Sequence, residues 1–146
     1  MMRARWFVIG GLAFVVACGT QKRRRHKMND VGDANIVVVG QKLGLELPPG
    51  TQVIGIQTEA GIDDAIFAKL RIPAARTAEF LKQCGVTRFK SGGANLLGPD
   101  HGFWDPHQAK RLRSGDVALP SARDLLIAID ESASDALIVY AMNYST

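Results

Sequence analysis

The chain has 146 residues, with 18 Lys and Arg against 14 Asp and Glu, which is enough length for one compact core but not for two. The basic excess is confined to the first 27 residues, because residues 28–146 hold 11 basic and 14 acidic residues, a net charge of −3. A domain that binds nucleic acid carries its basic patch on the folded part, so the charge distribution argues against a nucleic-acid partner.

The N-terminal residues have the pattern of a bacterial lipoprotein signal. Arg3 and Arg5 precede an apolar segment, 6–17, whose twelve residues are too few to span a membrane, which takes about 20. Small residues then lead to a cysteine in Val15-Val16-Ala17-Cys18, as in a lipobox. We predict a signal peptide over residues 1–17 and a product whose first residue, Cys18, carries acyl chains such as palmitate. An ordinary secretory signal that is cleaved at the same small residues is the alternative.

A lipid anchor predicts a place in the bacterial cell envelope, on a membrane face outside the cytoplasm. Gly19, rather than Asp, follows the cysteine, which favours the outer membrane in a Gram-negative cell. Residues 18–35 are polar and charged, so we predict a lipidated cysteine and a basic flexible tether there, followed by a single domain over residues 36–146. The five basic residues between 22 and 27 disfavour translocation of the chain on their carboxyl side, and the sequence leaves this conflict open.

The first half of the domain shows clear periodicity. Residues 36–47 combine helical spacing with a β-branched run, and we favour a short helix over a strand. Residues 52–58 and 65–72 alternate apolar and polar side chains, which predicts an antiparallel hairpin. An apolar stripe between Pro73 and Gly85 then predicts a helix over 73–84, with Cys84 as a buried apolar residue.

The second half of the domain is less regular. Residues 86–123 are rich in loop-forming sequences, and Asp105-Pro106 indicates a short helix that runs to about Arg113. Residues 124–130 and 136–144 again have the side-chain pattern of β-strands and predict a second hairpin. Together these elements predict an α+β fold: a small antiparallel sheet made from two β-hairpins, with one main helix packed on one face.

Several segments are shared with proteins of a known kind. They are the lipobox, the polar tether, the segments 45–51 and 61–65, Ile72-Pro73 with the Phe80-Leu81 helix, and Phe103-Trp104-Asp105-Pro106. With these features the chain resembles small uncharacterised bacterial lipoproteins. The resemblance implies location and fold, because that family has no agreed activity. Some small lipoproteins of this size are immunity proteins, so the resemblance also suggests an inhibitor or immunity role.

Phe103 and Trp104 form the strongest candidate for a binding site, together with Arg111 and Arg113 further along the chain. Tryptophan and arginine are enriched at binding hot spots, so this combination favours contact with a protein. The alternative is structural: Trp104 covers the sheet and holds the irregular segment onto the core.

The residues Asp100, His101, Asp105 and His107 are a potential set of metal ligands. Their spacing differs from that of zinc sites, so four polar residues in a solvent-exposed loop are the simpler interpretation. The sequence shows no arrangement for acid–base or nucleophilic catalysis. We therefore expect no catalytic residues, no metal, no cofactor and no small-molecule substrate.

These observations predict a membrane-anchored envelope lipoprotein that is not an enzyme. Its acylated Cys18 would contact membrane lipid, and its domain would act as a protein-binding or accessory module for another envelope protein. The alternative is a small envelope hydrolase or metal-dependent enzyme that uses the 100–107 loop.

Overall fold

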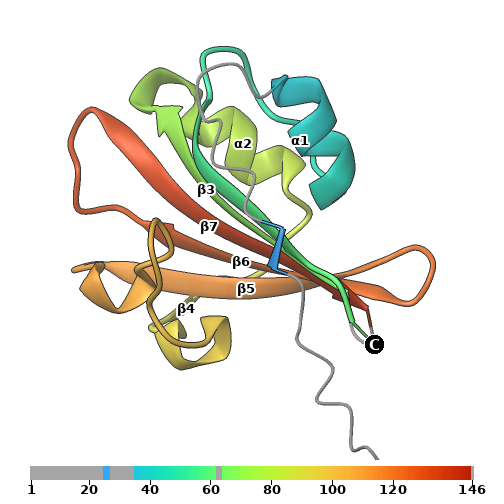
Figure 1. The fold of residues 1–146 in the computed structure, drawn as a ribbon. Coiled ribbons are helices and arrows are strands. Elements are labelled where there is room, and N and C mark those ends of the chain that lie inside the picture. Colours follow the sequence, from blue (N-terminus) through green and yellow to red (C-terminus); the bar gives the residue numbers. More distant parts are fainter. Residues whose placement is uncertain (1–24, 27–34, 62–63, 146) are drawn as a thin grey trace, which may run out of the picture.

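The computed structural model describes residues 25–26, 35–61 and 64–145, so the predicted signal peptide, Cys18 and most of the predicted tether lie outside the described residues. The described part is built on an antiparallel sheet of seven strands in the order β1-β2-β3-β7-β6-β5-β4 (Figure 1). The strands are β1 (Arg25–His26), β2 (Gln52–Glu59), β3 (Ala65–Pro73), β4 (Lys90–Ser91), β5 (Leu112–Leu119), β6 (Arg123–Asp130) and β7 (Ala136–Ser145).

Both predicted hairpins are confirmed. β2 pairs with β3 from Gln52↔Arg71 to Glu59↔Ala65, and β6 pairs with β7 from Arg123↔Ser145 to Asp130↔Ile138. Strand β3 also pairs along its whole length with β7, so the two hairpins join into one sheet. The sheet is therefore larger than the two hairpins that the sequence indicates.

The predicted helix between Asp105 and Arg113 is wrong. Only a 3₁₀ turn, η3 (Pro106–Gln108), forms there, and the chain then enters β5, which pairs with β6 over its full length. The burial of β5 alternates at its start, with Leu112 and Ser114 buried and Arg113 exposed. This alternation is hidden in the sequence because a serine, a glycine and an aspartate follow Arg113 where apolar residues would mark a strand.

One face of the sheet is covered by two helices, α1 (Ile36–Leu43) and α2 (Thr77–Gln83), with the 3₁₀ turn η1 (Ala74–Arg76) leading into α2 (Figure 1). The helix predicted over 73–84 is confirmed as this η1–α2 unit. The helix favoured over 36–47 is shorter than expected, because Asn35 caps its start and Gly44, at a φ of 72°, ends it. The prediction of one main helix thus needs correction, since α1 packs on the same face.

The buried residues under these helices form the larger core. Leu43 of α1 and Phe80 of α2 are fully buried against strand residues such as Leu70, Ile127 and Val139. Cys84 belongs to this cluster, and burial raises the pKa of its thiol. The predicted role of Cys84 as a buried apolar residue is therefore confirmed.

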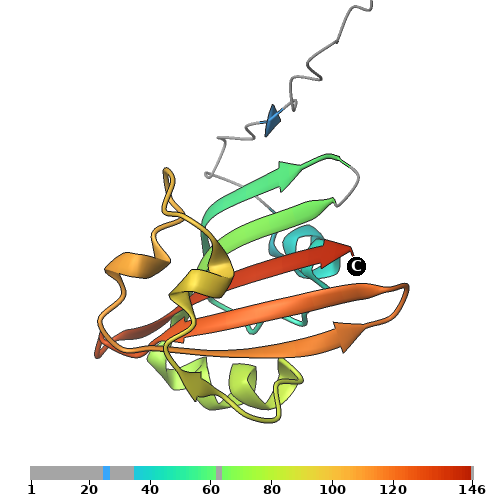
Figure 2. The ribbon, with the colours of Figure 1, turned by 90° about the horizontal axis from the view of Figure 1, so that it is seen from below.

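The opposite face of the sheet is covered by irregular chain. The segment from Gly92 to Lys110 includes the 3₁₀ turns η2 (Ala94–Leu97) and η3, and it crosses one end of the strands (Figure 2). A second apolar cluster lies beneath it: Leu97, Trp104, Leu112, Leu126, Ala128 and Tyr140. Both faces of the sheet are thus buried, one by helices and one by this segment, which carries most of the candidate functional residues.

Candidate functional site

Trp104 lies in the second core. Its side chain has no exposed surface, and its indole N–H donates a hydrogen bond of 2.9 Å to the carbonyl oxygen of Leu97. Its ring meets Phe67 and Tyr140 edge to face, with centroids 5.2 and 5.5 Å away. The prediction that Trp104 offers an aromatic anchor to a partner is therefore wrong for this structure, and the alternative, that it covers the sheet, holds.

Phe103 is partly buried and packs on the same cluster from above β2. A Cβ atom at Gly55 of β2 would lie 2.2 Å from the Phe103 ring, so the ring is seated directly on the glycine backbone. The pairing of β2 with β3 shifts register between Val53 and Gly55, at the same place. Phe103 thus fixes the irregular segment to the edge of the sheet, and its side chain stays partly exposed.

Asp105 also turns toward the sheet. One carboxylate oxygen accepts hydrogen bonds from the Lys69 ammonium at 2.5 Å and from the Tyr140 hydroxyl at 2.8 Å. Burial raises the pKa of Tyr140, and the neighbouring Asp105 carboxylate raises it further. A carboxylate that is held by a cation and a neutral phenol links the segment to β3 and β7 and is not a free general base.

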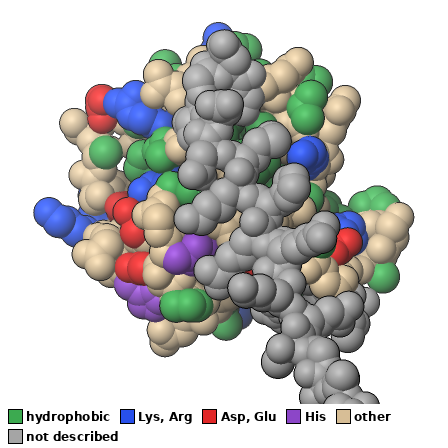
Figure 3. Space-filling view, in the orientation of Figure 1, with side chains coloured by type: hydrophobic (Ala, Val, Ile, Leu, Met, Phe, Trp, Pro, Cys, Tyr) green, Lys and Arg blue, Asp and Glu red, His purple; other side chains and the backbone are tan. Residues whose placement is uncertain are grey.

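Asp100 and His107 form a hydrogen-bonded pair at the surface. His107 Nδ1 lies 2.8 Å from an Asp100 oxygen, which also accepts the His107 backbone N–H at 3.1 Å. Desolvation opposes ionisation of Asp100, but the hydrogen bonds from His107 and Gln108 outweigh it and lower the Asp100 pKa. The space-filling view in Figure 3 shows histidine and acidic side chains next to one another on the surface. The pair holds η3 in place and leaves His107 Nε2 facing Asn95 at 3.4 Å.

The four residues that the sequence offers as metal ligands do not converge. Asp105 binds Lys69 and Tyr140, while His101 places Nδ1 3.0 Å from the Pro99 carbonyl oxygen and packs against Phe67. The Nε2 atom of His101 is buried and lacks a hydrogen-bond partner within the described residues. Only Asp100 and His107 meet, and the described residues contain no group of three or more His, Cys, Asp or Glu that could hold a metal ion.

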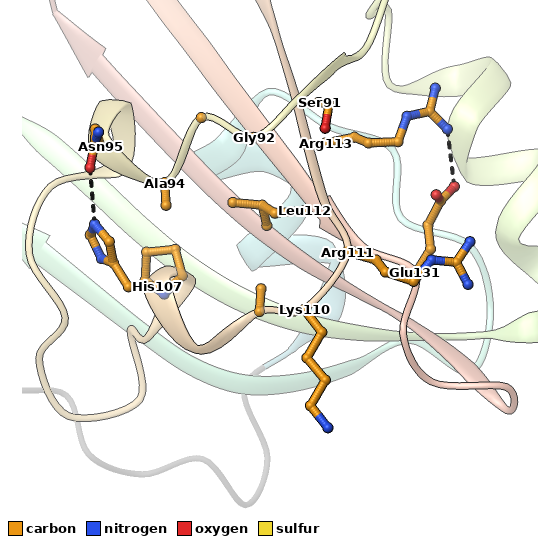
Figure 4. Close-up of a pocket in the computed structure, with 13 residues that line it drawn as sticks. Ser91, Gly92, Ala94, Asn95, His107, Lys110, Arg111, Leu112, Arg113 and Glu131 are labelled. Atoms are coloured by element: carbon orange, nitrogen blue, oxygen red, sulfur yellow. Dashed lines mark hydrogen bonds and ion pairs between the residues drawn. The ribbon is translucent and has the colours of Figure 1, made fainter.

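A groove of about 610 Å³ lies between the two halves of the irregular segment. One wall is formed by residues 91–95 and the other by residues 106–113 (Figure 4). Ala94, Pro106, Ala109 and Leu112 provide its apolar lining, whereas His107 and Asn95 close one end. Arg113 and Glu131 lie at the opposite end, joined by an ion pair of 3.2 Å.

The charged groups of this groove are mainly basic. Lys110, Arg111 and Arg113 line it, against the single carboxylate of Glu131 among its lining residues. Arg113 is occupied in part, since its guanidinium pairs with Glu131 and lies 5.7 Å from the Phe89 ring centroid. The side chains of Lys110 and Arg111 have no ion pair within the described part of the chain.

The backbone holds these cations in position. The Arg111 N–H donates to Asp130 Oδ1 at 3.2 Å, and the Arg111 carbonyl oxygen accepts from the Glu131 N–H at 3.3 Å. Asp130 also accepts hydrogen bonds from the backbone and hydroxyl of Ser132, which fixes its carboxylate. These hydrogen bonds fix the backbone at the start of β5, from which the Arg111 and Arg113 side chains extend.

The structure thus separates the predicted site residues. Phe103 and Trp104 serve packing, while Arg111 and Arg113 line the groove. Asn95 and Glu131, which also line it, escape sequence reasoning because they lie far from the arginines in sequence. A weak signal is present in Ser91-Gly92-Gly93-Ala94, a small-residue run that lets the wall of the groove approach Ser114: a Cβ at Gly93 would lie 1.9 Å from the Ser114 hydroxyl.

Comparison of the chain with protein-family models, with curated proteins and with solved structures finds no match. Within the described residues, no helix has the length and apolar character needed to cross a membrane.

Proposed function

We propose that this protein is an envelope lipoprotein, anchored through acylated Cys18, whose domain binds another envelope protein through the basic groove. The observation that carries the binding proposal is the gathering of Lys110, Arg111 and Arg113 around an apolar recess. Surface cations without internal partners contribute little to folding, so their position beside a recess favours a role in recognition. The proposed location rests on the lipobox at residues 15–18.

The domain is proposed to be a binding module rather than an enzyme. Two side chains that the sequence offers as functional candidates have structural contacts instead: Asp105 binds Lys69 and Tyr140, and Trp104 lies in the core. Within this class, an inhibitor or immunity role fits a small anchored domain that presents one recognition surface.

The proposal is tested by recovering the partner of the lipidated protein from its own envelope after cross-linking. The test variant is Lys110→Glu combined with Arg111→Glu, which reverses the charge of the groove. The matched control is Lys42→Glu with Lys82→Glu, which makes the same change on the two helices of the opposite face. We expect the control to retain the wild-type partner and the groove variant to lose it. Equal recovery by all three proteins would exclude the groove as the contact surface.

A second candidate function, a small hydrolase, is favoured by one observation. The Asp100 carboxylate orients His107 as it would orient a general base, and His107 lines the groove. Within the described residues, however, His107 has no hydrogen bond to a serine, threonine or cysteine side chain. If this candidate is right, purified protein should hydrolyse ester or peptide substrates, and His107→Ala should abolish that activity, whereas His101→Ala, whose ring contacts Pro99 and Phe67 instead, should not. Purified protein without hydrolytic activity would remove this candidate.

A further inference from the structure

We propose that the groove binds an extended acidic peptide segment of the partner, in which an apolar side chain is flanked by aspartate or glutamate. This inference rests on the proposed binding function and adds the chemistry of the ligand. Three features of the groove carry it: the sign of its charge, its apolar lining, and the arrangement of the two along its length.

The sign of the charge selects an anionic ligand. Residues 28–146 carry a net charge of −3, yet the groove collects Lys110, Arg111 and Arg113 against Glu131. A local excess of positive charge on an acidic domain attracts acidic ligands and repels basic ones. The basic run of this same chain between residues 22 and 27 has the same sign as the groove and is therefore excluded as its occupant.

The apolar lining selects a ligand with an apolar side chain. Ala94 and Leu112 border the recess (Figure 4), and Ala109 also lines it. A volume of about 610 Å³ is within the range of pockets that hold a drug-sized ligand, so the groove has room for a peptide side chain and its neighbours. A planar membrane surface would meet the projecting cations but not this recessed lining, so the shape favours a narrow peptide over anionic headgroups.

The arrangement of the groove orients the peptide. The hydrogen bond between His107 and Asn95 closes one end, and the contact of Glu131 with Arg113 limits the charge available at the other. The uncompensated cations among the described lining residues are Lys110 and Arg111. We therefore expect an acidic side chain of the peptide on Lys110 and Arg111 and its apolar neighbour against Ala94 and Ala109, which are less buried than Leu112.

The experiment is selection from a displayed library of random heptapeptides on the full acylated protein in detergent. We expect wild-type protein to enrich sequences with aspartate or glutamate next to leucine, isoleucine, valine or phenylalanine. A synthetic copy of the most enriched peptide should bind roughly tenfold more weakly to the Lys110→Glu, Arg111→Glu variant, because two surface ion pairs become repulsive. It should bind equally to the Lys42→Glu, Lys82→Glu control, and its amide analogue, with Asn and Gln for Asp and Glu, should lose affinity on wild type.

Ala109→Asn tests the apolar lining separately, because it adds a polar side chain without a charge, with circular dichroism to confirm that the variant is folded. We expect it to weaken the peptide by a similar factor. Enrichment of neutral or basic peptides would overturn the inference, as would equal binding to wild type and the charge-reversed variant. So would displacement of the peptide by mixed micelles that contain phosphatidylglycerol but not by micelles that contain phosphatidylcholine, which would assign the groove to lipid. If the envelope partner is nevertheless lost in the charge-reversed variant, the proposed function stands and only its acidic-peptide chemistry fails.

Discussion

Neighbouring residues in the segment 103–105 serve one structural purpose. Phe103, Trp104 and Asp105 all turn toward the sheet, where they contact Gly55, Tyr140 and Lys69. Burying a large aromatic side chain contributes several times the free energy of a surface contact. The main role of a buried tryptophan in such a segment is therefore to stabilise the fold. The residues that resemble a binding motif in sequence thus attach the irregular segment, which forms the groove, to the sheet.

Trp104→Ala should destabilise the protein by about 3–5 kcal/mol, the usual cost of truncating a buried aromatic side chain. Trp104→Phe should cost less, because it keeps part of the packing but loses the hydrogen bond to Leu97. Urea denaturation followed by circular dichroism gives both values. Leu96→Ala, at a residue 64% exposed in the same segment, is the control and should change stability little. A small effect of Trp104→Ala would contradict its place in the core. This variant therefore tests folding and is unsuitable as an interface probe.

Asp100→Asn should destabilise the protein at neutral pH, with an effect that depends on pH. The pKa of Asp100 in the folded protein is lowered from its ordinary value of 3.8. The stability that its ionised form contributes is therefore present above pH 3.8 and is lost as the pH falls through the lower folded value. The free energies of unfolding of wild type and variant should differ near neutral pH and converge in acid. Asp116→Asn, at an exposed position on β5, is the control. A difference that persists below the folded pKa would refute the electrostatic explanation.

At the scale of elements, some central strands form because of their own sequence pattern, and others form because a neighbouring strand pairs with them. Alternation is clear in β3 and β6, and the structure confirms both as strands. β5 is a strand because β6 offers a full-length partner, and its own sequence contains a serine and a glycine at buried positions. Pairing and burial thus outweigh a weak intrinsic preference, as is common for strands.

Gly55→Ala should destabilise the protein by about 1–3 kcal/mol, because the new methyl group would overlap the Phe103 ring at 2.2 Å. The ring is seated on the strand at this point and would have to move away from the second core. A double-mutant cycle with Phe103→Ala is the measurement. We expect Gly55→Ala to cost much less in the Phe103→Ala background. Additive effects would show that the contact with Phe103 is not the cause.

The whole molecule is a sheet with two unlike coverings. Helices α1 and α2 bury one face, and the irregular segment between Gly92 and Lys110 buries the other. The helical face carries the larger core, while the irregular face carries the groove. The surface proposed to recognise a partner thus lies on the irregular face, while both faces contribute a buried core.

The proposed lipid anchor can be tested on the whole molecule. Cys18→Ala should move the protein from the membrane fraction to the soluble fraction, because two or more acyl chains are what give stable attachment to a bilayer. Fractionation with immunoblotting measures the distribution, and mass spectrometry of wild type should find the acylated cysteine as the first residue. The domain should fold alike in both proteins, which circular dichroism would show. A Cys18→Ala protein that stays on the membrane would contradict the anchor.

The sequence by itself determined the elements that carry their own pattern. Alternation in residues 52–58, 65–72 and 124–130, and the apolar stripe before Gly85, were sufficient because the type of each element follows from the spacing of its own apolar residues. The predicted lipobox is also a local pattern, and it stays a prediction. For the candidate site, sequence reasoning found Arg111 and Arg113 from residue type alone.

Only the tertiary structure decided the rest. It placed Trp104 in the core, converted the expected helix before Arg113 into β5, and brought Asn95 and Glu131 beside the arginines to form the groove. These outcomes depend on contacts between segments that are far apart in the chain. An aromatic ring is buried, or a groove formed, only when two segments of the chain pack together. The pattern of a single segment describes one of the two and does not indicate its partner.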